Sequence, residues 1–119
     1  MEMKLQNSTP TEDYDGIDYW IDDIPFQRRD REISLTKYGD VSVRYYSHGG
    51  ETEFAKILAD KFLAIYWVFR FTDAEVIVST KDIKNELQKG NYILRPNNDG
   101  TQGAYIKLAS LPQKIVRWF

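Results

Sequence analysis

The chain has 119 residues, of which 42% are hydrophobic and 14% aromatic, which is enough for one domain with a single core and too little for a second domain. Cysteine is absent and the formal net charge is −2, so disulfides, thiol nucleophiles and thiolate zinc sites are excluded and a strongly basic nucleic-acid binder is disfavoured. No apolar run reaches the roughly 20 residues of a membrane span, and residues 1–11 are too polar for a signal peptide, so we expect a cytoplasmic protein that does not enter the membrane.

Charge is unevenly distributed along the sequence. Residues 1–26 carry seven acidic side chains and one lysine, whereas residues 27–119 carry 15 basic and 11 acidic side chains. An acidic region beside a mildly basic one suits a site that binds a metal cation together with a polyanion. Solvated surface charge is the more common cause of such asymmetry.

The first predicted element follows a loose N-terminal arm at residues 1–8. Thr9 suits an N-cap, Pro10 the first helical position and Glu12 the third position after the cap, so a helical turn should begin here. The helix must be short, because Gly16 ends it.

Two apolar and aromatic runs, residues 17–21 and 24–29, flank Asp22 and Asp23 in the pattern of a tight β-hairpin. Alternation with a period of two divides the second run between two faces of the strand. One face would hold Ile24, Phe26 and Arg28, and the other Pro25, Gln27, Arg29 and Arg31.

The middle of the chain predicts one more strand, a helix and a buried strand. After a loop at residues 34–39, residues 40–46 alternate as the third strand of a meander. Apolar spacing from Thr52 predicts an amphipathic helix of about three turns. Residues 63–71 are the most hydrophobic run, and we expect them to form a central strand covered on both faces.

The last third of the sequence predicts short strands and one further helix. Ser79 suits the N-cap of a helix whose Ile83 and Leu87 face the core, and residues 111–119 form either a terminal helix or a packed tail. The short strands are expected at residues 75–78, 92–94 and 104–108. The whole pattern predicts one α/β (α+β) domain, spanning residues 1–119, in which a mixed sheet starts with a three-stranded meander and is flanked by two to three helices.

This order of elements, with an Asp on the first hairpin strand facing a polar-x-basic triplet on the second, resembles the PD-(D/E)XK (restriction-endonuclease-like) nuclease superfamily. Members of that superfamily hold an Asp and an acidic-x-Lys triplet on such a hairpin, with a further acid from the first helix. By position, Asp18 matches the Asp, Gln27 the acid of the triplet and Arg29 the lysine. Either Glu12 or Asp13 matches the helix acid.

The resemblance implies a Mg²⁺-dependent endonuclease that hydrolyses the phosphodiesters of DNA. Asp18, Gln27 and Arg29 would be its catalytic residues, and Asp18, Gln27 and either Glu12 or Asp13 would bind Mg²⁺ through oxygen, the ligand atom this ion prefers. The guanidinium of Arg29 can clamp a phosphate but stays protonated, so it cannot be the general base. Nucleic-acid binding would extend over Arg28, Arg29, Arg31 and Arg44.

The sequence departs from the superfamily pattern at three positions. No proline precedes Asp18, an amide at Gln27 replaces a carboxylate, and Arg29 replaces the lysine. Fewer carboxylates lower the affinity for a metal ion and weaken a hydrolytic step that depends on it. Two alternatives are therefore open: an active nuclease, or an inactive nuclease fold that binds nucleic acid or a protein partner, such as an accessory factor of a phage or mobile element.

Each candidate also has a purely structural interpretation. Asp18 would cap the hairpin or pair with an arginine, and the arginine-rich run at residues 28–31 would be a charged edge strand. Glu53 most simply supplies favourable charge at a helix N-terminus, with metal ligation as the alternative. A third functional class is also open, an oligomeric structural or inhibitory protein, such as a homodimer, that uses edge strands or Trp118 and Phe119.

Overall fold

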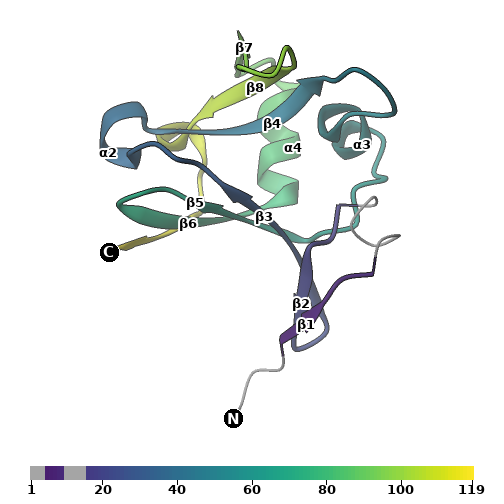
Figure 1. Cartoon of the computed structure of the whole chain (residues 1–119), viewed down its shortest axis with the longest axis vertical. Coiled ribbons are helices and arrows are strands. Elements are labelled where there is room, and N and C mark those ends of the chain that lie inside the picture. Colours follow the sequence, from purple (N-terminus) through teal and green to yellow (C-terminus); the bar gives the residue numbers. More distant parts are fainter. Residues whose placement is uncertain (1–4, 10–15) are drawn as a thin grey trace.

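The computed structural model describes residues 5–9 and 16–119, and this part of the chain forms two β-sheets (Figure 1). The larger sheet contains β1 (Leu5–Asn7), β2 (Tyr19–Ile21), β3 (Ile24–Asp30), β5 (Tyr66–Arg70), β6 (Ala74–Ser79) and β9 (Ile115–Trp118). The smaller sheet contains β4 (Asp40–Tyr46), β7 (Ile93–Pro96) and β8 (Gln102–Lys107). The strand orders are β1-β2-β3-β5-β6-β9 and β4-β8-β7.

Three α-helices and one 3₁₀ turn accompany the sheets in the described residues. They are α2 (Leu35–Tyr38), α3 (Glu53–Leu58), α4 (Thr80–Gln88) and the turn Leu108–Ser110. None of these helices is long and apolar enough to cross a membrane. The expected α+β class is confirmed, with the strands divided between two sheets.

The larger sheet is mixed because one of its strand pairs is parallel. β3 runs parallel to β5, with Gln27 opposite Trp67 and Arg29 opposite Phe69, whereas every other neighbouring pair in the two sheets is antiparallel. The crossover between β3 and β5 contains α2, β4 and α3. It therefore carries the chain through the smaller sheet before returning it to the larger one.

The predicted hairpin is confirmed. β2 pairs with β3 so that Ile21 lies opposite Ile24, and the two residues between them, Asp22 and Asp23, have φ angles of 48° and 66°. Two consecutive residues with positive φ are what a two-residue type I′ turn requires, and Asp is among the few non-glycine residues that adopt this conformation readily.

The core lies between the larger sheet, the smaller sheet and α4. Trp67 is fully buried, and its ring stacks between those of Phe62 and Phe69, with centroid separations of 5.1 and 5.3 Å. The same cluster includes Val41 and Val43 of β4, Ala104 and Ile106 of β8, and Ile83 and Leu87 of α4. Figure 1 shows the smaller sheet and α4 on one side of the larger sheet, while β1 and β2 project away from the rest.

Helix α4 begins and packs as predicted. The hydroxyl of Ser79 accepts a hydrogen bond from the backbone N–H of Asp82 at 3.1 Å, and Ile83 and Leu87 are buried. Helix α3 is shorter than the three turns expected, because Asp60 adopts a left-handed conformation with φ 57°. The chain reverses there, so Phe62 packs against Trp67 and does not extend the helix.

Four local predictions were wrong. Residues 5–7, expected in a loose arm, form β1 and complete the meander with β2 and β3. Residues 40–46 form a strand but lie in the smaller sheet, because the free edge of β3 is taken by β5. Residues 34–39, expected as a loop, contain α2, and residues 111–119 contain the edge strand β9. The helical turn predicted to begin at Thr9 falls largely outside the described residues.

The central strand β5 also differs from its prediction. Its inward residues Trp67 and Phe69 belong to the core, whereas on the opposite face Val68 is buried but Tyr66 is 36% exposed. Hydrophobicity along the run predicted the strand itself. It could not show that none of the helices in the described residues covers the Tyr66 face of the sheet, because that depends on the path of the whole chain.

Candidate functional site

Asp18 lies at the beginning of β2 and is tied to the backbone of β3. Its carboxylate Oδ2 accepts a hydrogen bond from the backbone N–H of Arg28 at 2.7 Å, and its own backbone N–H donates to the carbonyl oxygen of Phe26 at 2.8 Å. The side chain thus takes the place of a backbone acceptor in the ladder. Asp18 therefore caps the hairpin, as its structural interpretation predicted. The same hydrogen bond holds the carboxylate beside the peptide bond between Gln27 and Arg28.

The arginines of β3 divide between the two faces of the sheet, as the alternation predicted. On the inner face the guanidinium of Arg29 lies over the Trp67 ring, 5.5 Å from its centroid, and that of Arg31 lies 5.9 Å from the centroid of Phe71. On the outer face Arg28 forms an ion pair with Asp30 at 2.8 Å. The predicted nucleic-acid-binding set is therefore separated, with Arg28 on the opposite side from Arg29.

Glu53, from the first turn of α3, holds three segments together. Its Oε2 pairs with Arg29 Nη2 at 2.5 Å, and its Oε1 accepts a hydrogen bond from the backbone N–H of Arg44 at 2.7 Å. The side chains of Arg29 and Glu53 are only 20% and 18% exposed. Charge-assisted hydrogen bonds of this kind are strong when shielded from water, so the pair fixes α3 and β4 against β3.

A depression of about 290 Å³, here called the Gln27 pocket, opens beside this ion pair. Side chains that line it include Gln27, Arg29, Glu51, Glu53 and Lys56, and Arg44 also contributes. Its wall depends on glycine: Gly16 has φ 92°, and a Cβ at that position would lie 2.3 Å from the ring of Phe62. Any side chain at Gly16 would displace that ring.

A second depression of about 430 Å³ is here called the Asn98 pocket. Arg29 and Arg44 line both depressions. The Asn98 pocket adds Arg31, Asp99 and Tyr105, among others. The two depressions, together called the polar groove, thus share Arg29 and Arg44 as lining residues.

Burial and hydrogen bonding shift the pKa values of several side chains in or near these two depressions. Burial lowers the pKa of Arg31, whose Nη1 donates to the Ser42 hydroxyl at 3.0 Å. Burial raises the pKa of Asp40, while the nearby charges of Arg31 and Arg95 oppose that change. The Thr101 hydroxyl and backbone N–H donate to Asp99 and lower the pKa of its carboxyl.

Of the site residues predicted from sequence, Gln27, Arg29 and Arg44 line the Gln27 pocket, whereas Asp18 and Arg28 do not. Asp18 is bonded to the strand that carries Gln27 and Arg29. Glu12 and Asp13 lie outside the described residues. Arg44 was predicted only as a nucleic-acid contact, and Glu51 and Lys56 were not predicted, because nothing in their local sequence indicates that the crossover returns them to β3.

The side chains of Gln27, Glu51 and Glu53 bring oxygen atoms to the lining of the Gln27 pocket. The described residues hold no group of three or more His, Cys, Asp or Glu side chains that could bind a metal ion. Mg²⁺ does not need such a group, because it commonly keeps several waters and binds one or two carboxylates together with substrate phosphate. Gln27 and Glu51 line the pocket, where Glu51 also pairs with Lys61 at 3.4 Å, whereas Asp18 does not line it and is bonded to the backbone of Arg28.

His48 is the one histidine in the sequence, and its contacts are structural. Its ring lies 6.0 Å from that of Tyr46, and its Nε2 lies 3.2 Å from the carbonyl oxygen of Asp99. These contacts join the end of β4 to the loop after β7.

Comparison of the chain with protein-family models, with curated proteins and with solved structures gives no significant match in any of the three.

Proposed function

We propose that this chain is a divergent nuclease of the PD-(D/E)XK type that hydrolyses DNA phosphodiesters with Mg²⁺. The observation that carries the proposal is the Gln27 pocket, where Gln27 and Arg29 from β3 meet Glu51 and Glu53 from the segment around α3. Asp18 adds a carboxylate held on the backbone of Arg28. Oxygen donors for a cation and a guanidinium for a phosphate are the two sets of groups that such hydrolysis uses.

The mixture of positive and negative side chains in the Gln27 pocket favours a hydrolytic metal site over a site that only attracts phosphates. Its lining carries the cations of Arg29, Arg44 and Lys56 and the anions of Glu51 and Glu53. A protein that binds nucleic acid mainly by neutralising phosphates needs an excess of cations. A site that holds a metal ion on a phosphodiester needs both signs within a few ångströms.

Asp18 and Gln27 would hold Mg²⁺, with Glu12 or Asp13 as the further acid implied by the superfamily resemblance. When bound, the ion would polarise a phosphoryl oxygen and lower the pKa of a coordinated water. Arg29 binds the phosphate, and its stacking on Trp67 and pairing with Glu53 fix the direction in which its guanidinium faces. A phosphate oxygen would accept hydrogen bonds from the remaining N–H groups of Arg29.

A second candidate is a nuclease fold that binds DNA without cleaving it. Both carboxylate oxygens of Glu53 are already hydrogen-bonded within the protein, one to Arg29 and one to Arg44. The position of the second metal-binding acid is occupied by the neutral amide of Gln27. These two features reduce the charge available to a cation, and so favour binding over hydrolysis.

Nicking of supercoiled plasmid in Mg²⁺ or Mn²⁺ tests the proposal. Asp18→Asn should abolish nicking, because the amide oxygen can still accept from the backbone N–H of Arg28 while the charge that holds the ion is lost. Arg28→Ala, on the outer face, is the matched control and should nick at the wild-type rate. Circular dichroism would verify that both variants fold.

Two results would overturn the proposal. Nicking that persists in Asp18→Asn, or in EDTA, would remove the assigned metal site. Plasmid binding that depends on Arg29 but never leads to nicking with either metal would establish the second candidate in its place.

A further inference from the structure

We infer that β9 is an interface through which two copies of this chain pair edge to edge, so that their larger sheets join into one. The inference goes beyond the proposed function, because it concerns one edge of the larger sheet and none of the residues that line the polar groove. It is carried by the unpaired backbone of β9 and by a register in which two copies of this strand complement each other.

The backbone of β9 presents hydrogen-bonding groups at the edge of the sheet. In an antiparallel pair, residues that exchange hydrogen bonds with the neighbouring strand alternate with residues whose N–H and C=O groups face away from it. The backbone N–H of Phe119 donates to the carbonyl oxygen of Asp73 at 3.0 Å, and Trp118 lies opposite Ala74. The N–H and C=O groups of Trp118 and Val116 therefore face away from β6, where no further strand of the described residues pairs with them.

The other sheet edges in the described part of the chain are shorter or protected. β1 has three residues, and β7 ends in Pro96, which has no N–H to donate. On β4 the backbone N–H of Arg44 donates to Glu53. In and beside β9, by contrast, the side chains of Ile115, Trp118 and Phe119 are exposed. An edge of this kind is a template for pairing with another chain.

Two copies of β9 complement each other in an antiparallel register centred on Val116. A two-fold axis there sets Val116 opposite its own copy, and their outward N–H and C=O groups exchange hydrogen bonds. Ile115 then lies opposite Arg117 of the partner subunit. Trp118 lies opposite Lys114 of the partner subunit. The adjacent register, centred on Arg117, would place two arginines directly opposite each other, which destabilises a sheet.

The side chains on both faces of the joined strands have suitable neighbours in this register. On the inner face the indole of Trp118, which is 58% exposed, meets the stem and ammonium of the partner subunit's Lys114, and a cation over an aromatic ring is favourable. On the outer face Arg117 lies opposite Glu75 of its own β6. Its charge is therefore balanced within its own subunit, while its aliphatic stem covers the partner's Ile115.

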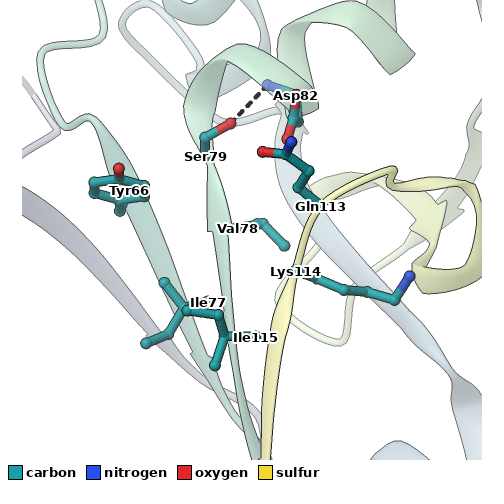
Figure 2. Close-up of a pocket in the computed structure, with 8 residues that line it drawn as sticks. All are labelled: Tyr66, Ile77, Val78, Ser79, Asp82, Gln113, Lys114 and Ile115. Carbon is teal, nitrogen blue, oxygen red and sulfur yellow. Dashed lines mark hydrogen bonds between the residues drawn. The ribbon is translucent and has the colours of Figure 1, made fainter.

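The depression shown in Figure 2 lies at the end of this interface. It has a volume of about 220 Å³ and lies where β6 meets β9, with a lining that includes Tyr66, Ile77, Ile115, Asp82, Gln113 and Lys114. In the register centred on Val116, Phe119 of the partner subunit lies beside Gln113, at the rim of the depression. The Phe119 ring is 57% exposed, with the guanidinium of Arg70 at 5.0 Å from its centroid. The two-fold axis repeats this contact at both ends of the paired strands.

The interface is small, so the dimer should be reversible. Ile115, Trp118 and Phe119 are each more than half exposed in the single chain, and a fully buried aromatic side chain removes about 150–250 Å² from water. Pairing would bury roughly 500 Å² on each subunit, which is at the lower limit of specific interfaces. We therefore expect a dissociation constant on the order of 10 μM.

Sedimentation equilibrium of the full chain tests the inference, at concentrations from about tenfold below to tenfold above that constant. The chain should change from monomer to dimer over this range. Ile115→Glu should tighten the dimer about fivefold, and Ile115→Lys should weaken it about fivefold, because each new charge faces Arg117 of the partner subunit and the axis repeats the pair. Position 115 is 64% exposed, so both variants should fold, which circular dichroism verifies.

Leu5→Glu and Leu5→Lys are the matched controls. Leu5 is 69% exposed and lies on β1, at the opposite edge of the same sheet, so neither change should alter the dissociation constant. A monomer at every concentration would overturn the inference, as would a shift in the same direction for Ile115→Glu and Ile115→Lys. Opposite shifts at Leu5, with none at Ile115, would place the interface on β1 and overturn the assignment to β9.

Discussion

Arg28 and Arg29 are neighbours in β3, yet they meet opposite environments on the two faces of the larger sheet. The Arg28 side chain is 43% exposed and pairs with an Asp30 that is 64% exposed, whereas Arg29 is 20% exposed, lies over Trp67 and pairs with the half-buried Glu53. Exposed ion pairs contribute little, because water and salt screen them. A shielded pair keeps its direction and strength, so the inner arginine has the more fixed orientation of the two.

The outer face is built for packing between strands. The rings of Tyr19, Phe26 and Tyr66 stack across β2, β3 and β5, with centroid separations of 5.5 and 5.6 Å. Figure 2 shows Ile77 and Ile115 continuing this apolar surface toward β9. Cross-strand pairs of this kind stabilise a sheet but bring no convergent polar groups. The inner face lies toward the smaller sheet, and the polar groove lies where the two sheets meet.

The largest expected difference between the faces is in stability. Trp67→Ala should lower the free energy of unfolding by about 3–5 kcal/mol, because it leaves a cavity between Phe62 and Phe69. Tyr66→Ala, one residue away on the outer face, should cost about 1 kcal/mol or less, since the loss is one cross-strand pair. Urea denaturation measures both.

If Trp67→Ala does not fold, Trp67→Phe serves instead and should still lose more stability than Tyr66→Ala. Equal losses at the two positions would mean that something covers the outer face as well, and the comparison of faces would then be wrong.

The second difference is in DNA binding. Arg29→Ala should weaken binding by about tenfold or more, because it removes a bidentate phosphate donor from the Gln27 pocket. Arg28→Ala should change binding by less than about twofold, since its guanidinium lies on the other face and is paired with Asp30. Anisotropy titrations at two salt concentrations measure the affinities and the number of phosphate contacts. Equal losses would place the bound DNA on both faces.

The separation of these two arginines could be predicted from sequence, and so could the hairpin that carries them. Period-two alternation put Gln27 and Arg29 on one face and Phe26 and Arg28 on the other, and the paired aspartates at 22 and 23 indicated the turn. Both patterns depend only on neighbours within a few residues. The N-cap of α4 at Ser79 could also be predicted, because it too depends only on nearby residues.

The sheet that a strand joins could not be predicted in the same way. Residues 40–46 read as the third strand of a meander, but they pair with β8, more than 50 residues further along the chain. For the same reason, no local pattern predicts that Glu51 and Lys56 lie beside Gln27. Partners across a crossover depend on the competition among all strands for each edge, and no local pattern contains that information.

A third and smaller effect tests whether the inner ion pair restrains the site. Glu53→Gln keeps an acceptor for the backbone N–H of Arg44 but removes the charge that Arg29 faces. DNA affinity at low salt should rise about threefold, because the guanidinium is no longer neutralised. Thermal stability should fall slightly, since a charge-assisted bond is replaced by a neutral one. The same anisotropy assay measures the affinity, and a loss of affinity would mean that Glu53 contacts the ligand or its metal ion directly.

The smallest expected effect concerns the edge of the sheet, at the turn between β5 and β6. Asp73 accepts hydrogen bonds from the hydroxyls of Ser34 and Thr36 and from the backbone N–H groups of Leu35 and Thr36, and so caps α2. The hydroxyl donors hold the pKa of its carboxyl well below its usual range. Because the folded-state pKa is the lower one, the carboxylate stabilises the fold above the unfolded value near 3.8, and this contribution is lost as the pH falls from there through the folded-state pKa.

Asp73→Asn should therefore lower the midpoint of thermal unfolding by a few degrees at pH 7. Below about pH 4, the midpoint of the variant should fall less steeply with pH than that of the wild type. The asparagine amide retains one acceptor, but its NH₂ group cannot accept from the two hydroxyls. Asp30→Asn on the outer face is the control, since its exposed pair with Arg28 should leave the pH profile close to that of the wild type. Scanning calorimetry between pH 7 and pH 3 measures the unfolding midpoints of all three proteins. If the midpoint of Asp73→Asn falls with pH as steeply as that of the wild type, carboxylates other than Asp73 determine the stability at acid pH.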